Sequence, residues 1–284
     1  MNRLEPSEAG RSRRDLASAL KDLRVATGLS GERLARRCGM SQSKVSRIET
    51  GRVLPSVVDV QQILNALAID GDVQDELLKM VRVANAAYED VRASVRRGLH
   101  HRQRELASLE AAATHVRHFL PSLVTGLLQV PEYMTAALAS TVRPLNGDLS
   151  KVTSLKLMRQ AVLHEEGKRF DFLITENAAR WRRCSPSVMA LQLDRIISVS
   201  RLPAVTVGVL PLDAQVSEGA FHTFVVYDAK LVTAELFSGQ VVLRDPKDID
   251  YYTELFAFFQ ARALVGDDAR EQLNTWASDF RSEL

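Results

Sequence analysis

The first third of the chain consists of short segments whose apolar residues recur at helical spacing, separated by glycines and serines. The segment SRRDLASALKDLRVATG places its leucines on one side of a helix that we expect to end at Gly28. Ser30 and Ser41 are good N-caps for GERLARRC and QSKVSRIE, with a break at Gly39 between them. Amphipathic segments after Ser56 and over 72–91 complete the pattern. We therefore expect an all-α five-helix domain over residues 12–82, preceded by a flexible N-terminus over 1–11.

From residue 105 onward the pattern becomes mixed. ELASLEAAATHVRHFL (105–120) predicts a helix, whereas RFDFLIT, AVTVGVLP, FHTFVVYD, LVTAELF and QVVLRD have the β-branched and aromatic content of strands. Helical segments lie among these strands and at the end of the chain. The predicted fold class is α+β overall, with a mixed α/β domain over 105–284 that contains a small sheet. A basic helical connector over 83–104, which includes RASVRRGLHHRQR, joins the two domains.

The composition is ordinary for a soluble globular protein, with 46% hydrophobic and 25% charged residues. No apolar run approaches the roughly 18 residues of a membrane span, and the polar N-terminus lacks the apolar core of a signal peptide. We expect Cys38 and Cys184 to be reduced in a cytoplasmic protein. Residues 1–104 hold 19 Lys/Arg against 13 Asp/Glu, whereas the remainder holds 18 against 22. This asymmetry favours a polyanion as the partner of the first part, although a solvated charged surface would give the same count.

The polar stretch GMSQSKVSRIETG (39–51) contains few apolar residues, and their spacing suits two helices joined by a tight turn. Ala35 has to be small where the two helices cross, and Gly39 supplies the left-handed turn. The residues expected to point inward are Leu34, Ala35, Cys38, Met40, Val45 and Ile48. The residues left outside are Gln42, Ser43, Lys44, Ser46 and Arg47. This arrangement predicts a recognition helix over 42–49 that enters the major groove of DNA. An ordinary helical hairpin in a core is the alternative.

The stretch GLSGERLARRCGMSQSKVSRIETGRVLPS resembles the lambda-repressor/Cro-like helix-turn-helix of Xre-type transcriptional regulators. It shares with that family the GLS start, the LA pair, the turn glycine and the S-R-x-E-x-G ending followed by a proline. It departs from the family at Gly31, where a glutamine often braces the recognition helix and touches the DNA backbone. The resemblance implies double-stranded operator DNA as a partner. Because one such helix reads few base pairs, we expect a homodimer on a near-palindromic site.

We assign each polar residue of the predicted recognition helix a hypothetical contact with DNA. Gln42 is the best candidate for base readout, because its amide can pair with adenine N6 and N7. Ser43, Lys44, Ser46 and Arg47 face the same groove, and the lysine suits guanine or a phosphate. Contacts to the DNA backbone are expected from Arg33, Arg52, Arg11, Arg13 and Arg14.

Glu49 is expected to be structural, because a carboxylate that faced DNA would be repelled by the phosphates. In resembling domains this glutamate pairs with an arginine of the first helix. Arg24 occupies that position, so the resemblance implies a structural ion pair between Arg24 and Glu49.

Segments of the second domain, among them PSLVTGLLQVPEY, RFDFLITENAARW and LPAVTVGVLP, resemble a poorly characterised C-terminal domain found behind this helix-turn-helix in a large family of bacterial regulators. The resemblance implies control by an effector, either a small acidic partner protein or a small ligand. Leu273, Trp276 and Phe280 of the last helix cover either the domain's own sheet or a partner subunit. The alternative function is an antitoxin-like protein-interaction module in which DNA binding serves autoregulation.

We find no sequence signal for an enzyme, a metal or a cofactor. His115 and His118 stand three residues apart, but no cysteine or carboxylate lies at matching zinc spacing. Phosphate-binding loops, serine-hydrolase motifs and zinc-protease motifs are missing. Glu176 could line a cleft with Arg180 or Trp181, although a structural carboxylate is the simpler interpretation. We therefore expect a regulator rather than an enzyme.

Overall fold

The computed structural model of the chain describes residues 6–90, 99–138, 149–237 and 239–284. These residues belong to two compact units. The first unit comprises Met1–Glu89 and Val241–Asp248, and the second comprises Asp90–Gln240 and Ile249–Leu284. In the described part of the chain, no helix is long and apolar enough to cross a membrane.

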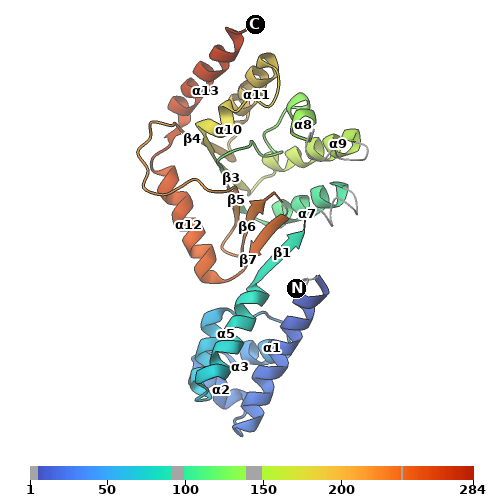
Figure 1. The fold of residues 1–284 in the computed structure, drawn as a ribbon, viewed down its shortest axis with the longest axis vertical. Coiled ribbons are helices and arrows are strands. Elements are labelled where there is room, and N and C mark those ends of the chain that lie inside the picture. Colours follow the sequence, from blue (N-terminus) through green and yellow to red (C-terminus); the bar gives the residue numbers. More distant parts are fainter. Residues whose placement is uncertain (1–5, 91–98, 139–148, 238) are drawn as a thin grey trace. The chain divides into compact units, whose positions relative to one another are not determined.

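The first unit is a helical bundle, as the sequence predicted (Figure 1). Its helices are α1 (Pro6–Ala26), α2 (Gly31–Cys38), α3 (Gln42–Glu49), α4 (Val57–Ala66) and α5 (Gly71–Asn85). All five contribute to one apolar core, whose most deeply buried members include Leu16, Leu20, Leu34, Val45, Ile48, Val60, Ile63, Leu64 and Val81. Because α2 and α3 have eight residues each, their stability depends on this shared core rather than on helix propensity.

The ends of this unit differ from the sequence-based expectation. α1 begins at Pro6, within the stretch expected to be flexible, and proline at the first helical position suits a helix start. α5 ends at Asn85, whose buried side-chain amide donates to the carbonyl oxygens of Val81 (3.0 Å) and Pro55 (2.8 Å).

The segment expected to be a helical connector over 83–104 also differs. After α5 the backbone forms strand β1 (Ala86–Asp90), and α7 (Leu99–Ala112) begins before the expected end of the connector. Arg92, Arg96 and Arg97 of the expected connector lie outside the described residues. The asparagine at the end of α5 fixes the last helical turn to the loop before α4, which marks where the first helical bundle stops.

The second unit contains a mixed sheet, which confirms the predicted mixed α/β class. Six of its strands follow one another in the order β6 (Leu231–Leu236), β5 (Phe224–Tyr227), β2 (His115–Leu120), β3 (Arg169–Thr175), β4 (Val205–Leu210) and β8 (Leu264–Val265). The pairs β2–β3 and β3–β4 are parallel, whereas β2–β5, β5–β6 and β4–β8 are antiparallel. Strand β7 (Gly239–Leu243) follows β6 along the chain.

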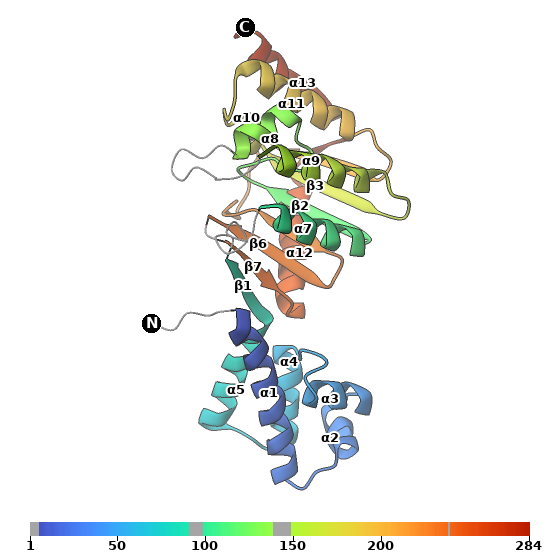
Figure 2. The same ribbon diagram turned by 90° about the vertical axis from the view of Figure 1, so that its right-hand side faces the viewer.

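Helices cover both faces of this sheet (Figures 1 and 2). Helices α7, α8 (Pro131–Leu138) and α9 (Leu149–Arg159) lie on one side, and α12 (Pro246–Gln260) and α13 (Gly266–Arg281) lie on the other. A 3-10 turn (Gln160–His164) follows α9, and α11 (Pro186–Val199) packs on α13. Leu273, Trp276 and Phe280 of α13 are buried within this chain, so they cover their own domain.

The helix expected over 105–120 is wrong in its second half. The chain ends α7 at Ala112 and then forms β2, which lies between β3 and β5 near the middle of the sheet. Val116, His118 and Phe119 are all buried there. Pairing with two strands that are distant in sequence overrides the local helical preference.

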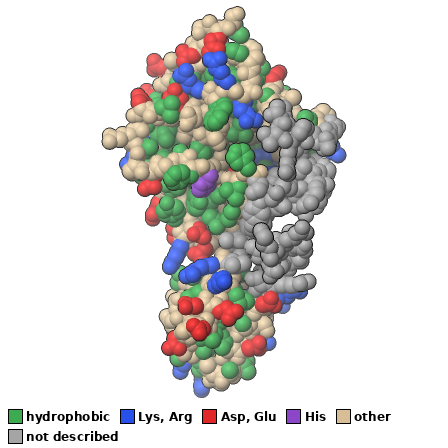
Figure 3. Space-filling model, in the orientation of Figure 1, with side chains coloured by type: hydrophobic (Ala, Val, Ile, Leu, Met, Phe, Trp, Pro, Cys, Tyr) green, Lys and Arg blue, Asp and Glu red, His purple; other side chains and the backbone are tan. Residues whose placement is uncertain are grey.

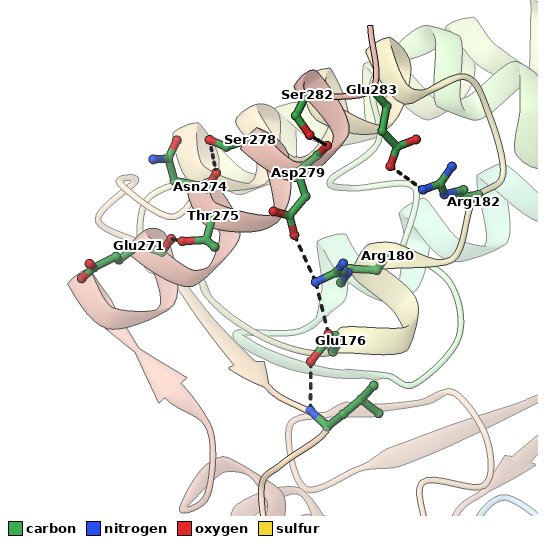
Figure 4. A network of polar contacts seen from close by, with 11 residues as sticks. Glu176, Arg180, Arg182, Glu271, Asn274, Thr275, Ser278, Asp279, Ser282 and Glu283 are labelled. Carbon is green, nitrogen blue, oxygen red and sulfur yellow. Dashed lines mark hydrogen bonds and ion pairs between the residues drawn. The ribbon is translucent and has the colours of Figure 1, made fainter.

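Glu176 lines an open hollow of about 420 Å³ together with Arg180 and Trp181, and it also has a structural role (Figure 4). It opens the short helix α10 (Glu176–Arg180), and its carboxylate accepts a hydrogen bond of 3.0 Å from the backbone N–H of Leu212. Arg180 lies 3.5 Å from Glu176 and 3.3 Å from Asp279 of α13. The carboxylate therefore links α10 to a loop and, through Arg180, to the last helix.

A single aspartate organises the turn between β5 and β6. Asp228 has a positive φ of 51°, which aspartate tolerates better than most residues. Its Oδ1 accepts hydrogen bonds from the backbone N–H groups of Thr114 (3.0 Å) and His115 (2.8 Å) and from the Thr114 hydroxyl (2.8 Å). These bonds hold the start of β2 and lower the pKa of Asp228 below its ordinary value, although partial burial opposes them.

Replacing this aspartate tests that role. We expect Asp228→Ala to lower the free energy of unfolding by about 1–3 kcal/mol, because the N–H donors at the start of β2 lose their acceptor. Asp228→Asn keeps an acceptor and the tolerance for positive φ, so it is expected to lose less. Thermal unfolding of the full chain measures both changes.

The wild type and Asp228→Ala also test how the stabilising effect of Asp228 depends on pH. The depressed pKa of Asp228 means that its contribution is present above the unfolded pKa, near 4, and is lost as the pH falls through the folded pKa. The difference in melting temperature between the wild type and Asp228→Ala should therefore shrink as the pH is lowered below about 4. A difference that stayed constant down to the acid limit would contradict this assignment.

Candidate nucleic-acid interface

Helices α2 and α3 are joined by a tight turn whose ends are capped by side chains. The Ser30 hydroxyl accepts from the backbone N–H of Arg33 (3.3 Å), and the Ser41 hydroxyl accepts from that of Lys44 (3.1 Å). Gly39 ends α2 with φ 64°, the left-handed conformation that glycine adopts without strain. The caps and the glycine together fix where α3 begins.

The inner side of the helix pair is apolar and closed. Ala35, Val45 and Ile48 are at most 2% exposed, which places their side chains in the core of the first unit. Leu34 and Cys38 are also buried, and Met40 packs against the same core while staying partly exposed. Burying the two larger side chains of α3 stabilises its position by about 1.5–3 kcal/mol each.

The outer side of α3 is polar and open to solvent. Gln42, Ser43, Ser46 and Arg47 are all exposed, and they lie on the face opposite the two buried residues. The Arg47 guanidinium donates to the carbonyl oxygen of Ser43 (3.2 Å), which aligns it along the helix. The four side chains therefore form one polar surface, which we call the α3 face.

Lys44 differs from its neighbours because it has a partner within the unit. Its ammonium group lies 2.7 Å from the carboxylate of Asp59 in α4. The same carboxylate accepts from the backbone N–H of Ser56, and the Ser56 hydroxyl accepts from the N–H of Asp59, which is a capping box. Sequence reasoning missed Asp59, although the spacing of Ser56 and Asp59 is the signal of such a box.

Arg24 and Glu49, the two residues expected to pair, meet in the structure. The guanidinium forms two hydrogen bonds with the carboxylate, at 2.7 and 3.0 Å, and a third with the carbonyl oxygen of Leu29 (2.8 Å). The two side chains are only 15% and 9% exposed. The bond to Glu49 raises the pKa of Arg24 above its ordinary value. The pair joins the end of α1 to the end of α3.

The other arginines expected at DNA surround the helix pair. Arg33 and Arg52 are exposed, the first near the start of α2 and the second just after α3. Arg14 is exposed on α1, whereas the side chains of Arg11 and Arg13 lie outside the described residues. The backbone at Gly31, where the family's glutamine is missing, starts α2 behind the Ser30 cap. In the described residues no group of three metal-ligating side chains comes together.

Comparison with known proteins identifies both parts of the chain. A family described as a helix-turn-helix domain matches residues 8–77, and a family described as a domain of unknown function (DUF5753) matches residues 103–275. No curated protein matches the chain significantly.

Two solved structures show remote similarity, each at 13% sequence identity. One is Nuc, a phospholipase D family member from Salmonella typhimurium, with a TM-score of 0.34 over 57% of this chain and 90% of that one. The other is TrmBL2, an archaeal chromatin protein described with a novel mode of DNA binding, with a TM-score of 0.33 over 73% of this chain and 66% of that one. At such low similarity neither structure says what this chain does.

The Arg24–Glu49 pair predicts a stability effect without a direct effect on DNA. Arg24→Ala leaves a half-buried carboxylate unpaired, so we expect the free energy of unfolding to fall by about 1–3 kcal/mol. Arg36→Ala is the matched control, since the Arg36–Glu32 pair on α2 is 80% and 66% exposed and should contribute less than about 0.5 kcal/mol. Thermal unfolding of the full chain tests both, and equal melting temperatures for the two variants would contradict the structural role.

Proposed function

Because the chain belongs to the DUF5753 family and carries a helix-turn-helix domain ahead of that domain, we propose that it is a sequence-specific DNA-binding transcriptional regulator. The α3 face is the observation that supports this proposal most directly. Its four exposed polar side chains stand on a helix whose opposite side is fixed in the core. An α-helix of this kind fits the major groove, where base edges are read by amide, hydroxyl and guanidinium groups.

The contacts that we propose divide between bases and backbone. Gln42 is placed at the N-terminus of α3, where residues of a recognition helix reach base edges, so it is assigned to adenine. Ser43, Ser46 and Arg47 are assigned to the same groove. Lys44 was expected to contact a base or a phosphate, whereas we assign it a structural role. Its bond to Asp59 connects α3 to α4, and a base contact would require that bond to break.

The phosphate contacts are assigned to cationic side chains at the edge of this surface. Arg33 in α2, Arg52 just after α3 and Arg14 in α1 are exposed, and Arg13 is assigned with them from its place in the sequence. Such contacts hold the protein in register without reading sequence. Backbone N–H groups at the start of α2 add a further phosphate site.

We propose that the protein acts as a cytoplasmic homodimer. A single short recognition helix contacts only a few base pairs, and specific binding usually needs two of them about 34–36 Å apart. The second unit is assigned both tasks that the first cannot perform, dimerisation and reception of an effector. The effector is a small ligand or a small acidic protein.

An antitoxin-like protein-interaction module is the second candidate, and exposed aromatic residues on the second unit favour it. Phe221, Phe237 and Tyr251 are 89%, 114% and 57% exposed. Figure 3 shows hydrophobic side chains gathered around a histidine on this unit. A stable complex with a small protein, formed equally well without DNA, would favour this candidate over the first.

Base readout by Gln42 has a specific signature. We expect Gln42→Ala to relax sequence preference at one position of each half-site, at a cost of about 1–3 kcal/mol for the preferred sequence. Selection of bound sequences from a random DNA pool, performed with the wild type and the variant, measures this change. If the variant bound all DNA sequences more weakly by the same factor, Gln42 would contact the DNA backbone rather than a base.

Arg52→Ala should behave in the opposite way. Loss of one phosphate contact weakens all sequences alike and lowers the slope of log K against log salt by about 0.9 for each subunit bound. Titrations of labelled operator DNA between low and moderate salt give this slope. Arg201→Ala, which removes an exposed arginine from the second unit, is the charge control and should leave the slope unchanged.

A further inference from the structure

The second unit holds a polar cavity with a volume of about 160 Å³. Its lining comes mostly from strands β2, β5 and β6 and from helices α7 and α9. These two helices lie on the side of the sheet away from α12 (Figure 2). Its volume is similar to that of a cavity of about 150 Å³ that admits benzene, so it suits a small molecule rather than a peptide. Its polar lining sets it apart from an ordinary packing defect.

Two of the three cations in this cavity are already paired. Arg159 forms a bidentate pair with Glu110 at 2.6 and 2.9 Å, and its remaining nitrogen donates to Gln103. Arg102 lies 3.6 Å from the carboxylate of Glu235. Together with Lys156, the lining carries three positive charges against two negative ones, so the described side chains of the cavity keep a surplus of one positive charge.

Lys156 points its ammonium group into this cavity with donors to spare. Its aliphatic stem lies against Gly126, and in the described part of the chain Nζ donates to one acceptor, Oε1 of Gln129, at 3.1 Å. Burial, with a further contribution from the positive charge of Arg159, lowers the pKa of Lys156 to about 8, although the carboxylate of Glu235 opposes this shift. The ammonium form therefore still predominates at neutral pH.

His118 supplies a second polar group to the cavity. The residue is 3% exposed, and its Nε2 is buried with no hydrogen-bond partner in the described structure. The ring stacks on Phe172 at a centroid distance of 4.9 Å, which fixes its plane. Burial and the nearby Arg159 lower its pKa to about 3, so the imidazole is neutral. A buried polar atom without a partner destabilises the fold, and a ligand that bonded to it would remove this cost.

We propose that this cavity binds a small organic acid that carries both a carboxylate and a hydroxyl group. The carboxylate takes the position opposite Lys156, where it balances the surplus positive charge of the cavity. The hydroxyl bonds to Nε2 of His118, and because a hydroxyl both donates and accepts, it suits either neutral tautomer. The carbon skeleton lies against the apolar part of the lining, which includes Leu106, Leu120 and Val225.

This inference names the effector of the regulator proposed above, and only its regulatory meaning rests on that proposed function. Binding itself is a property of the second unit and is measured without DNA. If the protein binds the acid but its affinity for DNA does not change, the binding site stands and the role of the acid as effector is refuted.

The test uses the full chain and three hydroxy acids of increasing size: lactate, 3-hydroxybutyrate and 4-hydroxybenzoate. Isothermal titration and thermal unfolding are performed with each acid and with its uncharged amide. At least one acid is expected to bind and to raise the melting temperature, whereas its amide binds at least tenfold more weakly. Failure of all three acids, or equal binding of acid and amide, overturns the proposal.

Two variants locate the bound acid. Lys156→Met is expected to lower affinity at least tenfold, whereas the control Lys151→Met, on the exposed side of the same helix, keeps it. If Lys156→Met shifts the melting temperature of the unliganded protein, Lys156→Gln takes its place. His118→Phe keeps an aromatic ring but removes Nε2, so it should abolish the preference that the wild type shows for the bound hydroxy acid over the same acid without its hydroxyl group. An unchanged preference, or equal losses from both lysine variants, would show that the acid binds elsewhere.

Discussion

The burial of Val45 and Ile48 is the constraint on which the first unit depends. An isolated helix of eight residues, the length of α3, is not stable in water, because the free-energy cost of helix nucleation exceeds the stabilisation from its few backbone hydrogen bonds. Helix α3 therefore exists only while these two side chains remain in the core. Two polar links complete the attachment, Glu49 to Arg24 at one end and Lys44 to Asp59 at the other. Everything that fixes α3 lies on one side of it, and this is why the opposite side can carry exposed polar groups.

Local chemistry made this part of the chain predictable. Ser30, Gly39 and Ser41 each act on the few residues next to them, so their effect is visible in the sequence and matches the observed helix ends. The inward positions of Ala35 and Ile48 follow from helical spacing alone. Asp59 was missed because it acts at two distances at once, capping its own helix and reaching Lys44 on the preceding one.

The second unit shows where sequence reasoning fails. The stretch that forms β2 continues a helical pattern, yet its environment comes from β3 and β5, which lie more than 45 residues further along the chain. The cavity is built from groups just as distant, since Glu110 and Arg159 are 49 residues apart and Gln103 and Arg159 are 56 apart. Buried ionic groups leave no periodic signal, because a glutamate or an arginine on an amphipathic helix looks solvated until its partner is known.

The two units thus use charge in opposite ways. In the first, arginines such as Arg33, Arg47 and Arg52 stay in water, where they cost little desolvation and attract any polyanion within a Debye length. In the second, Arg159 and Glu110 are removed from water, and the desolvation cost is tolerable because each meets the other in a bidentate pair. A surface of the first kind favours fast, salt-dependent association with a large partner. In the proposed site such a pair leaves only one surplus positive charge, that of Lys156, so a bound cation would add a second buried charge without a counter-ion.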